Sequence, residues 1–157
     1  MTTEDADAAA DVVLRTTLVA YRAIFPLDAP PPTQAQMAGD WQARIAAGAT
    51  CLLAVDGVDP IGVVSASERD DEPGVGLLAR LYVVPDHWSH GVGRALYDEA
   101  LAEFVRRGHR EASLWVLRPN LRARSWYERV GWTLTGATKP VYEPAGLEDV
   151  EYRLLLV

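Results

Sequence analysis

The pattern of apolar and polar positions changes character about a third of the way along the chain. Before Gly48 the two kinds of residue are mixed, and two helices are predicted, over about Asp5–Ile24 and about Thr33–Ala47. The segment Phe25–Thr33 separates them, because its three consecutive prolines cannot occupy a helix interior. Thr33 is suited to cap the second helix, and Gly48 to end it.

After Gly48 the apolar residues form short runs that are typical of strands. The runs "TCLLAVDG" (residues 50–57) and "DPIGVVSASERD" (59–70) predict two strands joined by a tight turn at Asp56–Gly57. A third strand, nearly continuous in its apolar residues, is predicted over Val75–Val84 and closed by Pro85.

The rest of the chain alternates between the two patterns. A helix is predicted over about Gly91–Arg107, where Leu96, Ala100 and Phe104 fall on one face. The later elements are a strand at Glu111–Leu117, a short helix at 121–130 and two closing strands at 132–144 and 147–157.

This order of elements is typical of an α/β protein with a single mixed central sheet flanked by helices. A helix connects strands 75–84 and 111–117, so these two strands are expected to be parallel neighbours. The length of 157 residues suits one domain that spans residues 1–157.

Composition and charge narrow the class of protein. Apolar residues make up 49% of the chain, an ordinary globular share, and the net charge is −7. An acidic chain argues against nucleic acid as a partner and weakly favours cationic small molecules. The acidic start is unlike a signal peptide, and no apolar run approaches a membrane span, so a soluble cytoplasmic protein is expected. The single cysteine, Cys51, excludes an internal disulfide and is interpreted as a core thiol.

The stretch "HGVGRAL" (residues 90–96) stands between a predicted strand and a predicted helix. The first turn of a helix leaves N–H groups unpaired and, with the helix dipole, forms an anion site. Gly91 and Gly93 carry no Cβ that would hold a phosphate away, and His90 and Arg94 flank them with donors. The chain has no Walker sequence, and Leu96 occupies the third glycine position of the Rossmann pattern. On these residues alone, a pyrophosphate site and a glycine-eased turn without a ligand both remain open.

A second segment, "PNLRARSWYERVGW" (119–132), decides between them. Together with "LYVVPDHWSHGVGRAL" (81–96), it resembles the GNAT superfamily of acyl-CoA-dependent N-acetyltransferases. The resemblance covers nearly the whole chain in its order of elements. It implies a GNAT-like acyl-CoA N-acyltransferase fold, with acetyl-CoA as the cosubstrate.

The resemblance also implies roles for individual residues. Main-chain groups of Leu81 and Val83 would hold the pantetheine arm, Asn120 would contact the cofactor where two parallel strands splay, and Tyr127 would lie near the thioester sulfur. The pyrophosphate would be bound by the loop and helix start, that is by Ser89, His90, Gly91, Val92, Gly93 and Arg94.

The chemistry agrees with the implied role of Tyr127. Acyl transfer from a thioester expels a thiolate, and a phenol can donate the proton that it needs. Main-chain N–H groups beside the thioester carbonyl can stabilise the developing oxyanion. We therefore expect direct attack by a neutral amine, with Tyr127 as general acid, no covalent enzyme intermediate and no metal.

The sequence departs from the family in two respects. Trp88 stands where the family commonly has Gln or Arg, three residues before Gly91. The two positions that carry a general-base glutamate in many members are Leu77 and Trp115 here. The general base therefore stays open among bulk water and five residues, Glu68, Asp70, Asp71, Glu72 and His87.

Several functions fit these residues. The favoured one is an N-acetyltransferase acting on a primary amine, either a small molecule or an amino terminus. A noncatalytic acyl-CoA-binding sensor or interaction module is the alternative, and a nucleic-acid-directed acetyltransferase is disfavoured by the charge. A homodimer stays open. Tyr21 and Trp41, on the first two helices, either line the acceptor side or pack in the core.

Overall fold

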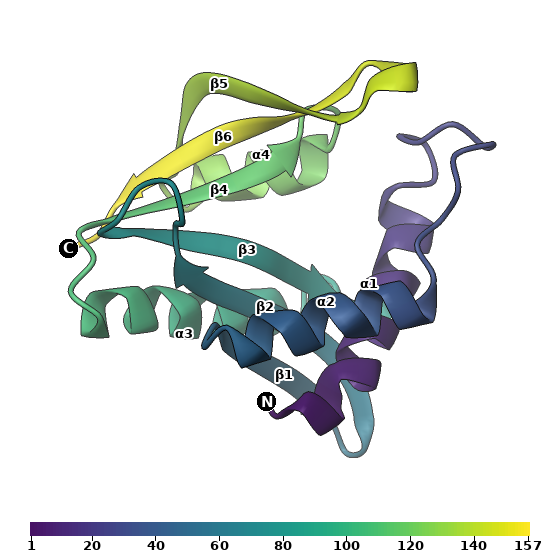
Figure 1. The fold of residues 1–157 in the computed structure, drawn as a ribbon, viewed down its shortest axis with the longest axis horizontal. Coiled ribbons are helices and arrows are strands. Elements are labelled where there is room, and N and C mark those ends of the chain that lie inside the picture. The colour runs from purple at the N-terminus through teal and green to yellow at the C-terminus, as the bar shows by residue number, and fades with distance from the viewer.

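The computed structural model describes residues 1–157 as one six-stranded sheet with helices on both faces (Figure 1). The helices are α1 (Ala6–Ala20), α2 (Gln34–Ala46), α3 (Val92–Arg106) and α4 (Leu121–Arg129). The strands are β1 (Thr50–Asp56), β2 (Asp59–Glu68), β3 (Val75–Val83), β4 (Glu111–Leu117), β5 (Thr133–Tyr142) and β6 (Leu147–Leu155). Single 3₁₀ turns occur at Thr3–Asp5, Pro85–His87 and Glu143–Ala145.

The strands lie in the order β1-β2-β3-β4-β6-β5, which confirms the predicted mixed α/β sheet. Every neighbouring pair is antiparallel except β3 and β4, the two strands that were expected to be parallel. The last strand, β6, lies inside the sheet between β4 and β5, so its apolar sequence is covered on both edges.

The parallel pair β3–β4 is joined over only part of its length. Residues Val75–Leu77 of β3 pair with residues Glu111–Ser113 of β4, and the pairing stops there. Beyond that point β3 stays with β2 and β4 stays with β6, and the two halves of the sheet diverge as Figure 1 shows. The fold therefore opens at its centre, between two strands whose edges are otherwise unpaired.

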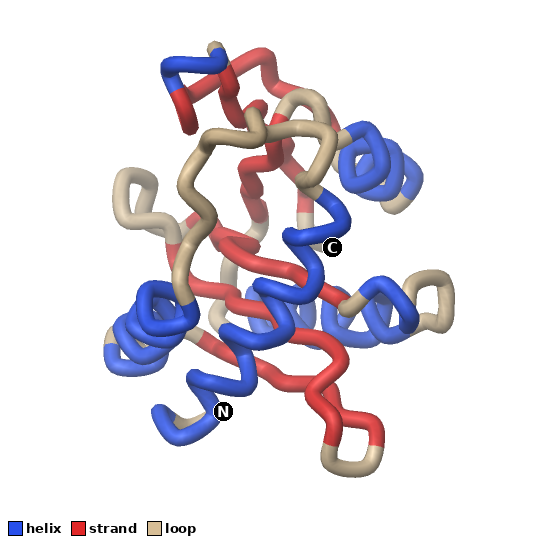
Figure 2. Tube along the Cα trace, turned by 90° about the vertical axis from the view of Figure 1, so that its right-hand side faces the viewer, coloured by secondary structure: helices blue, strands red, loops and turns tan.

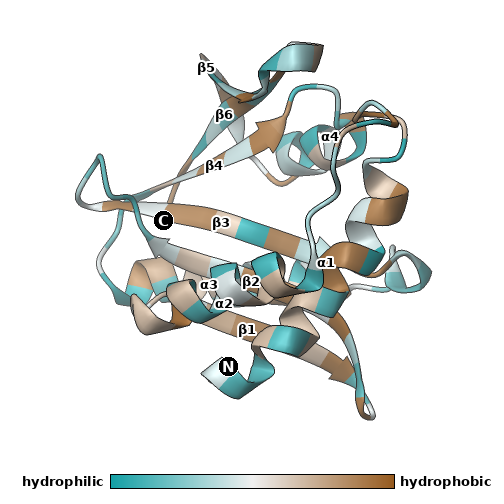
Figure 3. Ribbon diagram, turned by 45° about the vertical axis from the view of Figure 1, so that its right-hand side comes forward, coloured by the Kyte–Doolittle hydropathy of each residue, from teal (hydrophilic) through white to brown (hydrophobic).

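Two hydrophobic clusters hold helices against the two faces of the sheet. The α3 face carries the larger one, in which Phe104, Leu114 and Tyr152 are almost fully buried. On the other face α1 and α2 pack around Trp41 and Val63. Figure 2 shows the helices on either side of the sheet, and Figure 3 shows hydrophobic residues concentrated along the strands. No helix is long and apolar enough to cross a membrane.

Two predicted features of the first half need correction. The first helix ends at Ala20 rather than at Ile24, because the carbonyl of Tyr21 accepts the N–H groups of both Ile24 and Phe25 in a turn. Pro26 prevents the helix from resuming, since a proline disfavours helical backbone at the residue before it, here Phe25. The hairpin turn lies at Gly57–Val58, one residue later than predicted, with Gly57 at a φ of +61°.

Other predicted details are confirmed. The Thr33 side chain caps α2 by accepting the N–H of Gln36 at 3.2 Å. Cys51 is a buried free thiol, and Trp41 belongs to the core rather than to a binding site.

Candidate active site

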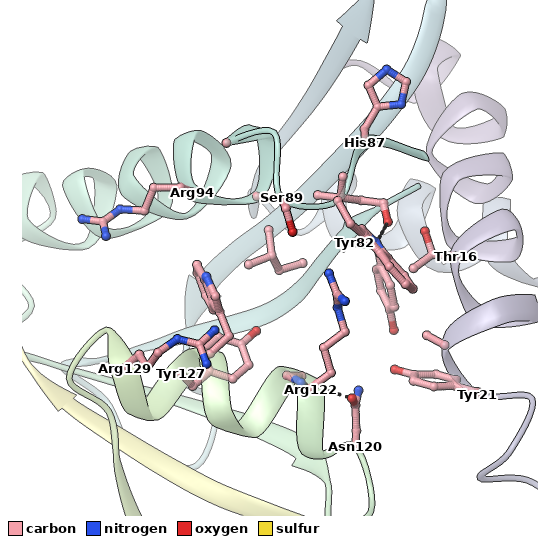
Figure 4. A pocket seen from close by; sticks show the side chains of 18 residues that line it. Thr16, Tyr21, Tyr82, His87, Ser89, Arg94, Asn120, Arg122, Tyr127 and Arg129 are labelled. Carbon is pink, nitrogen blue, oxygen red and sulfur yellow. Dashed lines mark hydrogen bonds between the residues drawn. The ribbon is translucent and has the colours of Figure 1, made fainter. Parts of the chain in front are cut away.

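A pocket of about 350 Å³ lies where the two halves of the sheet diverge (Figure 4). Residues from the end of α1, the end of β3, the loop before α3 with its first turn, and α4 line it. These include most of the residues that the resemblance singled out, namely Leu81, Val83, Ser89, Gly91, Gly93, Arg94, Asn120 and Tyr127. Segments far apart in the sequence are thus brought to one cavity.

His90 and Val92 are the two predicted residues that do not line this pocket. The His90 side chain is exposed and lies 6.4 Å from the ring of His87, measured between centroids. Val92 packs its side chain against both hydrophobic clusters. The side chain of Val92 is therefore unavailable to a ligand in this pocket, and the cofactor contacts of His90 and Val92 stay predictions.

The beginning of α3 offers unpaired backbone donors to the pocket. The first intrahelical bond runs from the N–H of Ala95 to the carbonyl of Gly91 at 3.0 Å, so the N–H groups of Val92, Gly93 and Arg94 have no acceptor within the helix. No side chain caps this end, whereas α2 and α4 are both capped. These free donors and the helix dipole favour an anion at this point.

The fold places different requirements on the two glycines, Gly91 and Gly93. Gly91 has a φ of +86°, a left-handed conformation that side chains other than glycine adopt only under strain, and a Cβ there would meet open space. Gly93 is in helical conformation, and its Cβ would lie 3.5 Å from Val83, an ordinary contact. The fold therefore requires Gly91, whereas it leaves room for a side chain at Gly93.

Backbone groups of β3 also face the gap between the diverging strands. The N–H of Val84 bonds to Ile61 in β2, so by alternation the main chains of Leu81 and Val83 point the other way. The carbonyl of Val83 accepts the indole N–H of Trp88 at 2.6 Å. Trp88, which departs from the family pattern, thus occupies the carbonyl of Val83 and leaves that of Leu81 on this edge.

The pocket is lined by cations and by no carboxylate. Arg94, Arg122 and Arg129 line it, although the chain as a whole carries a net charge of −7, and the guanidinium of Arg94 donates to the carboxylate of Asp98 at 2.8 Å. Figure 4 shows the Arg122 side chain pointing into the cavity from α4, and its guanidinium lies 4.1 Å from the ring centre of Trp88. Sequence reasoning missed Arg122 and Arg129, although their spacing of seven residues places both on one side of a helix.

Three tyrosines, Tyr21, Tyr82 and Tyr127, meet in the same cavity. Tyr127 is half-buried and packs edge-on against Trp126 and Trp132, with ring centroids 5.2 and 6.0 Å away. Burial raises the pKa of Tyr127 above that of a free phenol, and burial raises the pKa of Tyr21 as well. Both hydroxyls therefore keep their protons at neutral pH, and Tyr21 lines the pocket rather than serving only to pack.

The side chain of Asn120 has a structural task as well as a place in the pocket. Its Oδ1 accepts the N–H of Ala123 at 3.2 Å and caps α4. The amide nitrogen makes no hydrogen bond within the protein and can donate to a ligand.

The residues left open as general base lie in two places. The carboxylates from Glu68 to Glu72 are at the far end of the sheet, where Asp71 pairs with Arg69, and Glu72 with Arg153 at 2.5 Å. None of them lines the pocket. His87 does line it, and its Nδ1 is buried without a hydrogen-bond partner.

Solved structures identify the class of fold. The chain superposes on the PaiA N-acetyltransferase of Thermoplasma acidophilum, solved in complex with coenzyme A, with a TM-score of 0.81, 18% identity and coverage of 99% of this chain and 95% of that one. The ribosomal-protein-S18-alanine N-acetyltransferase of Escherichia coli gives a TM-score of 0.75 and 18% identity, covering 99% and 90% of the two chains. The fold is therefore that of N-acetyltransferases.

The sequence identifies the family. Residues 16–132 match the model of the acetyltransferase (GNAT) family, and the chain belongs to that family. An uncharacterised N-acetyltransferase of Archaeoglobus fulgidus is 40% identical over 53 residues, which are 34% of this chain. The match spans 36% of that relative's length.

Proposed function

We propose that this protein, with residues 1–157 as one domain, transfers the acetyl group of acetyl-CoA to a primary amine. The observation that carries the proposal is the start of α3, where free N–H groups face a cavity lined by three arginines and no carboxylate. A pyrophosphate and a further phosphate are the anions that such a site suits. Membership of the GNAT family supports acetyl-CoA as their source.

In this proposal each element of the pocket has one task. The loop and the first turn of α3 bind the pyrophosphate, Arg122 and Arg129 neutralise phosphate charge, and the main chain of Leu81 holds the pantetheine arm. When bound, acetyl-CoA supplies an activated acetyl thioester.

Tyr127 keeps its proton at neutral pH and donates it to the departing thiolate. The acceptor amine has to arrive at the thioester as the neutral base, because an ammonium group has no lone pair. His87, which lines the same cavity, can take up its proton directly or through water.

A second function, an acyl-CoA-binding module without turnover, is favoured by a specific observation. Both positions that carry a glutamate in many relatives are apolar or aromatic here, as Leu77 and Trp115. The two functions differ in one outcome. Incubated with acetyl-CoA and a panel of acceptor amines, the protein releases free thiol if it is an enzyme. It releases none if it is a binding module.

Titration calorimetry with acetyl-CoA tests the binding site itself, with Gly93→Glu as the variant. The fold has room for this side chain, but its carboxylate would occupy the start of α3, so we expect affinity to fall more than about 100-fold. Gly39→Glu is the matched control, because Gly39 is an exposed glycine of α2 with open space around it. Equal affinity in both variants, or no binding by folded wild-type protein, would refute the site.

A further inference from the structure

A second pocket, of about 310 Å³, lies beside the point where β3 and β4 separate. It is built from β3, β4, β5 and β6 together with Arg44 of α2, so it opens on the α2 side of the sheet. Leu77 and Trp115, the two apolar replacements of the usual glutamates, form part of its wall. Along β3 this pocket ends at Arg80, and the first pocket begins at the next residue, Leu81.

Three cations line this second pocket, and two of them have unused donors. Arg44 is satisfied by Asp40, to which it donates two hydrogen bonds of 2.9 and 3.2 Å. Arg80 approaches Asp40 only to 3.6 Å and otherwise donates to the carbonyl of Ala79. The ammonium of Lys139 lies 3.9 Å from Asp149, beyond hydrogen-bond distance. Arg80 and Lys139 therefore present donors to the cavity that no protein group takes up.

The local charge is positive although the chain is acidic. Arg44, Arg80 and Lys139 stand against Asp40 and Asp149, which leaves one positive charge in excess. The net charge of −7 weakly favoured a cationic acceptor, but the charges that face this pocket favour an anionic group instead. An anion here would be held by at least two side chains from different strands.

Burial makes this arrangement costly without an anion. Burial lowers the pKa of Lys139 below that of a free lysine, an effect that Asp149 only partly offsets. The ring of Trp115 lies under the ammonium, 4.6 Å from its centre, and fixes the Lys139 side chain over the pocket. A negatively charged ligand would stabilise this partly exposed cation.

From this geometry we infer that the acceptor is a small amine that also carries a carboxylate, an amino acid, whose carboxylate is bound by Arg80 and Lys139. The inference rests on the proposed function. A single carboxylate matches the one excess charge, whereas a phosphate would bring two. Because Arg80 of the second pocket and Leu81 of the first are consecutive residues of β3, a compact molecule whose amine and carboxylate lie close together suits both pockets.

Matched acceptors test this inference, with released thiol as the readout. The panel holds the common L-amino acids, their α-amides, the corresponding amines without a carboxylate, and O-phosphoethanolamine as the phosphate arm. At least one amino acid is expected to exceed its amide and its amine about 100-fold in kcat/KM. Turnover confined to amides, simple amines or the phosphorylated amine would overturn the inference, as would no turnover at all.

Variants connect the preference to the pocket. Arg80→Gln and Lys139→Gln should each reduce the preference for the carboxylate about tenfold, mainly through KM, with the Kd of acetyl-CoA unchanged. Arg106→Gln, at an exposed arginine of α3, is the control and should leave the preference intact. An unaltered preference in both pocket variants would overturn the inference. Failure of the proposed function is distinguishable, because it is absence of acetyl-CoA binding by the wild type or absence of thiol release with every acceptor, whereas thiol release confined to the other acceptors overturns the inference alone.

Discussion

The two pockets on either side of residue 80 differ in what makes them specific. The first one depends on the backbone, because its donors are the N–H groups at the start of α3 and the free edge of β3. The second one depends on side chains, since its polar groups are the ends of Arg44, Arg80, Lys139 and Asp149. Both exist because β3 and β4 pair only as far as Leu77 and Ser113.

This difference has a consequence for how each pocket can change. A site made of backbone donors is fixed by the fold, and most substitutions around it leave the donors in place. A site made of side-chain ends changes its charge with a single substitution. The fold can therefore keep one cofactor while its acceptor varies, and experiments that alter one pocket and leave the other unchanged measure how separate they are.

The largest effect is expected from Tyr127→Phe. Removing the hydroxyl removes the proton donor while the ring keeps its packing against Trp126 and Trp132, so turnover should fall about 100-fold. The Kd of acetyl-CoA should change less than about twofold, because a hydroxyl needed at the departing sulfur adds little to ground-state binding. Steady-state kinetics and calorimetry on the same preparation measure both quantities.

Tyr21→Phe provides the comparison for that result. Tyr21 lines the same cavity, and its pKa is likewise raised by burial, but it comes from α1 rather than α4. Its loss of turnover should be smaller than that of Tyr127→Phe. The reverse ranking would assign the acid to Tyr21, and no loss in either variant would leave the thiolate without a protein donor.

The difference between backbone donors and side-chain donors also decides how much of each pocket could be predicted from the sequence. Gly91, Gly93 and Asn120 lie at spacings set by one strand-to-helix turn and one helix cap, so a short stretch of sequence carries the signal. The parallel pairing of β3 with β4 followed from the helix that connects them.

The second pocket has no such signal. Arg44, Arg80, Lys139 and Asp149 belong to four elements, and only the pairing of β5 with β6, which sets Lys139 opposite Asp149, brings the last two together. The sequence therefore directed attention to the carboxylates of residues 68–72, which lie at the far end of the sheet, where Asp71 and Glu72 pair with arginines. Net charge averages over both regions, so it does not show the local excess of cations at the second pocket.

A smaller effect separates the two glycines of the loop. Gly91→Ala should destabilise the protein by about 1–2 kcal/mol, because alanine is strained at a φ of +86°. Gly93→Ala should be neutral or stabilising by up to about 1 kcal/mol, since the position is helical and a Cβ fits beside Val83.

Thermal or denaturant unfolding of the two variants without ligand measures this difference in stability. Titration calorimetry then measures their affinity for acetyl-CoA. Gly93→Ala should still lose about tenfold in acetyl-CoA affinity, because the methyl group stands where the phosphates approach the backbone. If Gly93→Ala binds as tightly as the wild type, the second glycine serves neither the fold nor the cofactor.

The smallest expected effect lies in the dependence of the rate on pH, where each pocket governs a different parameter. The raised pKa of Tyr127 means that its proton is lost only above the usual phenol range. At saturating substrates kcat should therefore rise as the amine loses its proton and then stay level, within about twofold, up to pH 10.

The value of kcat/KM for a carboxylate-bearing acceptor should instead decline on the alkaline side, because it depends on the charge of Lys139 in the free enzyme. Burial lowers the pKa of Lys139, the cations Arg80 and Arg69 lower it further, and Asp149 and Asp71 raise it by less. Lys139 carries its full positive charge below that lowered pKa and loses it as the pH rises through it. The loss therefore occurs at a lower pH than for a free lysine. Lys139→Gln should abolish the decline, which is expected to be a few-fold in wild type, without altering the kcat profile. If the decline persists in Lys139→Gln, or appears equally in kcat, its cause lies in the first pocket. The claim that each pocket governs a different kinetic parameter would then be wrong.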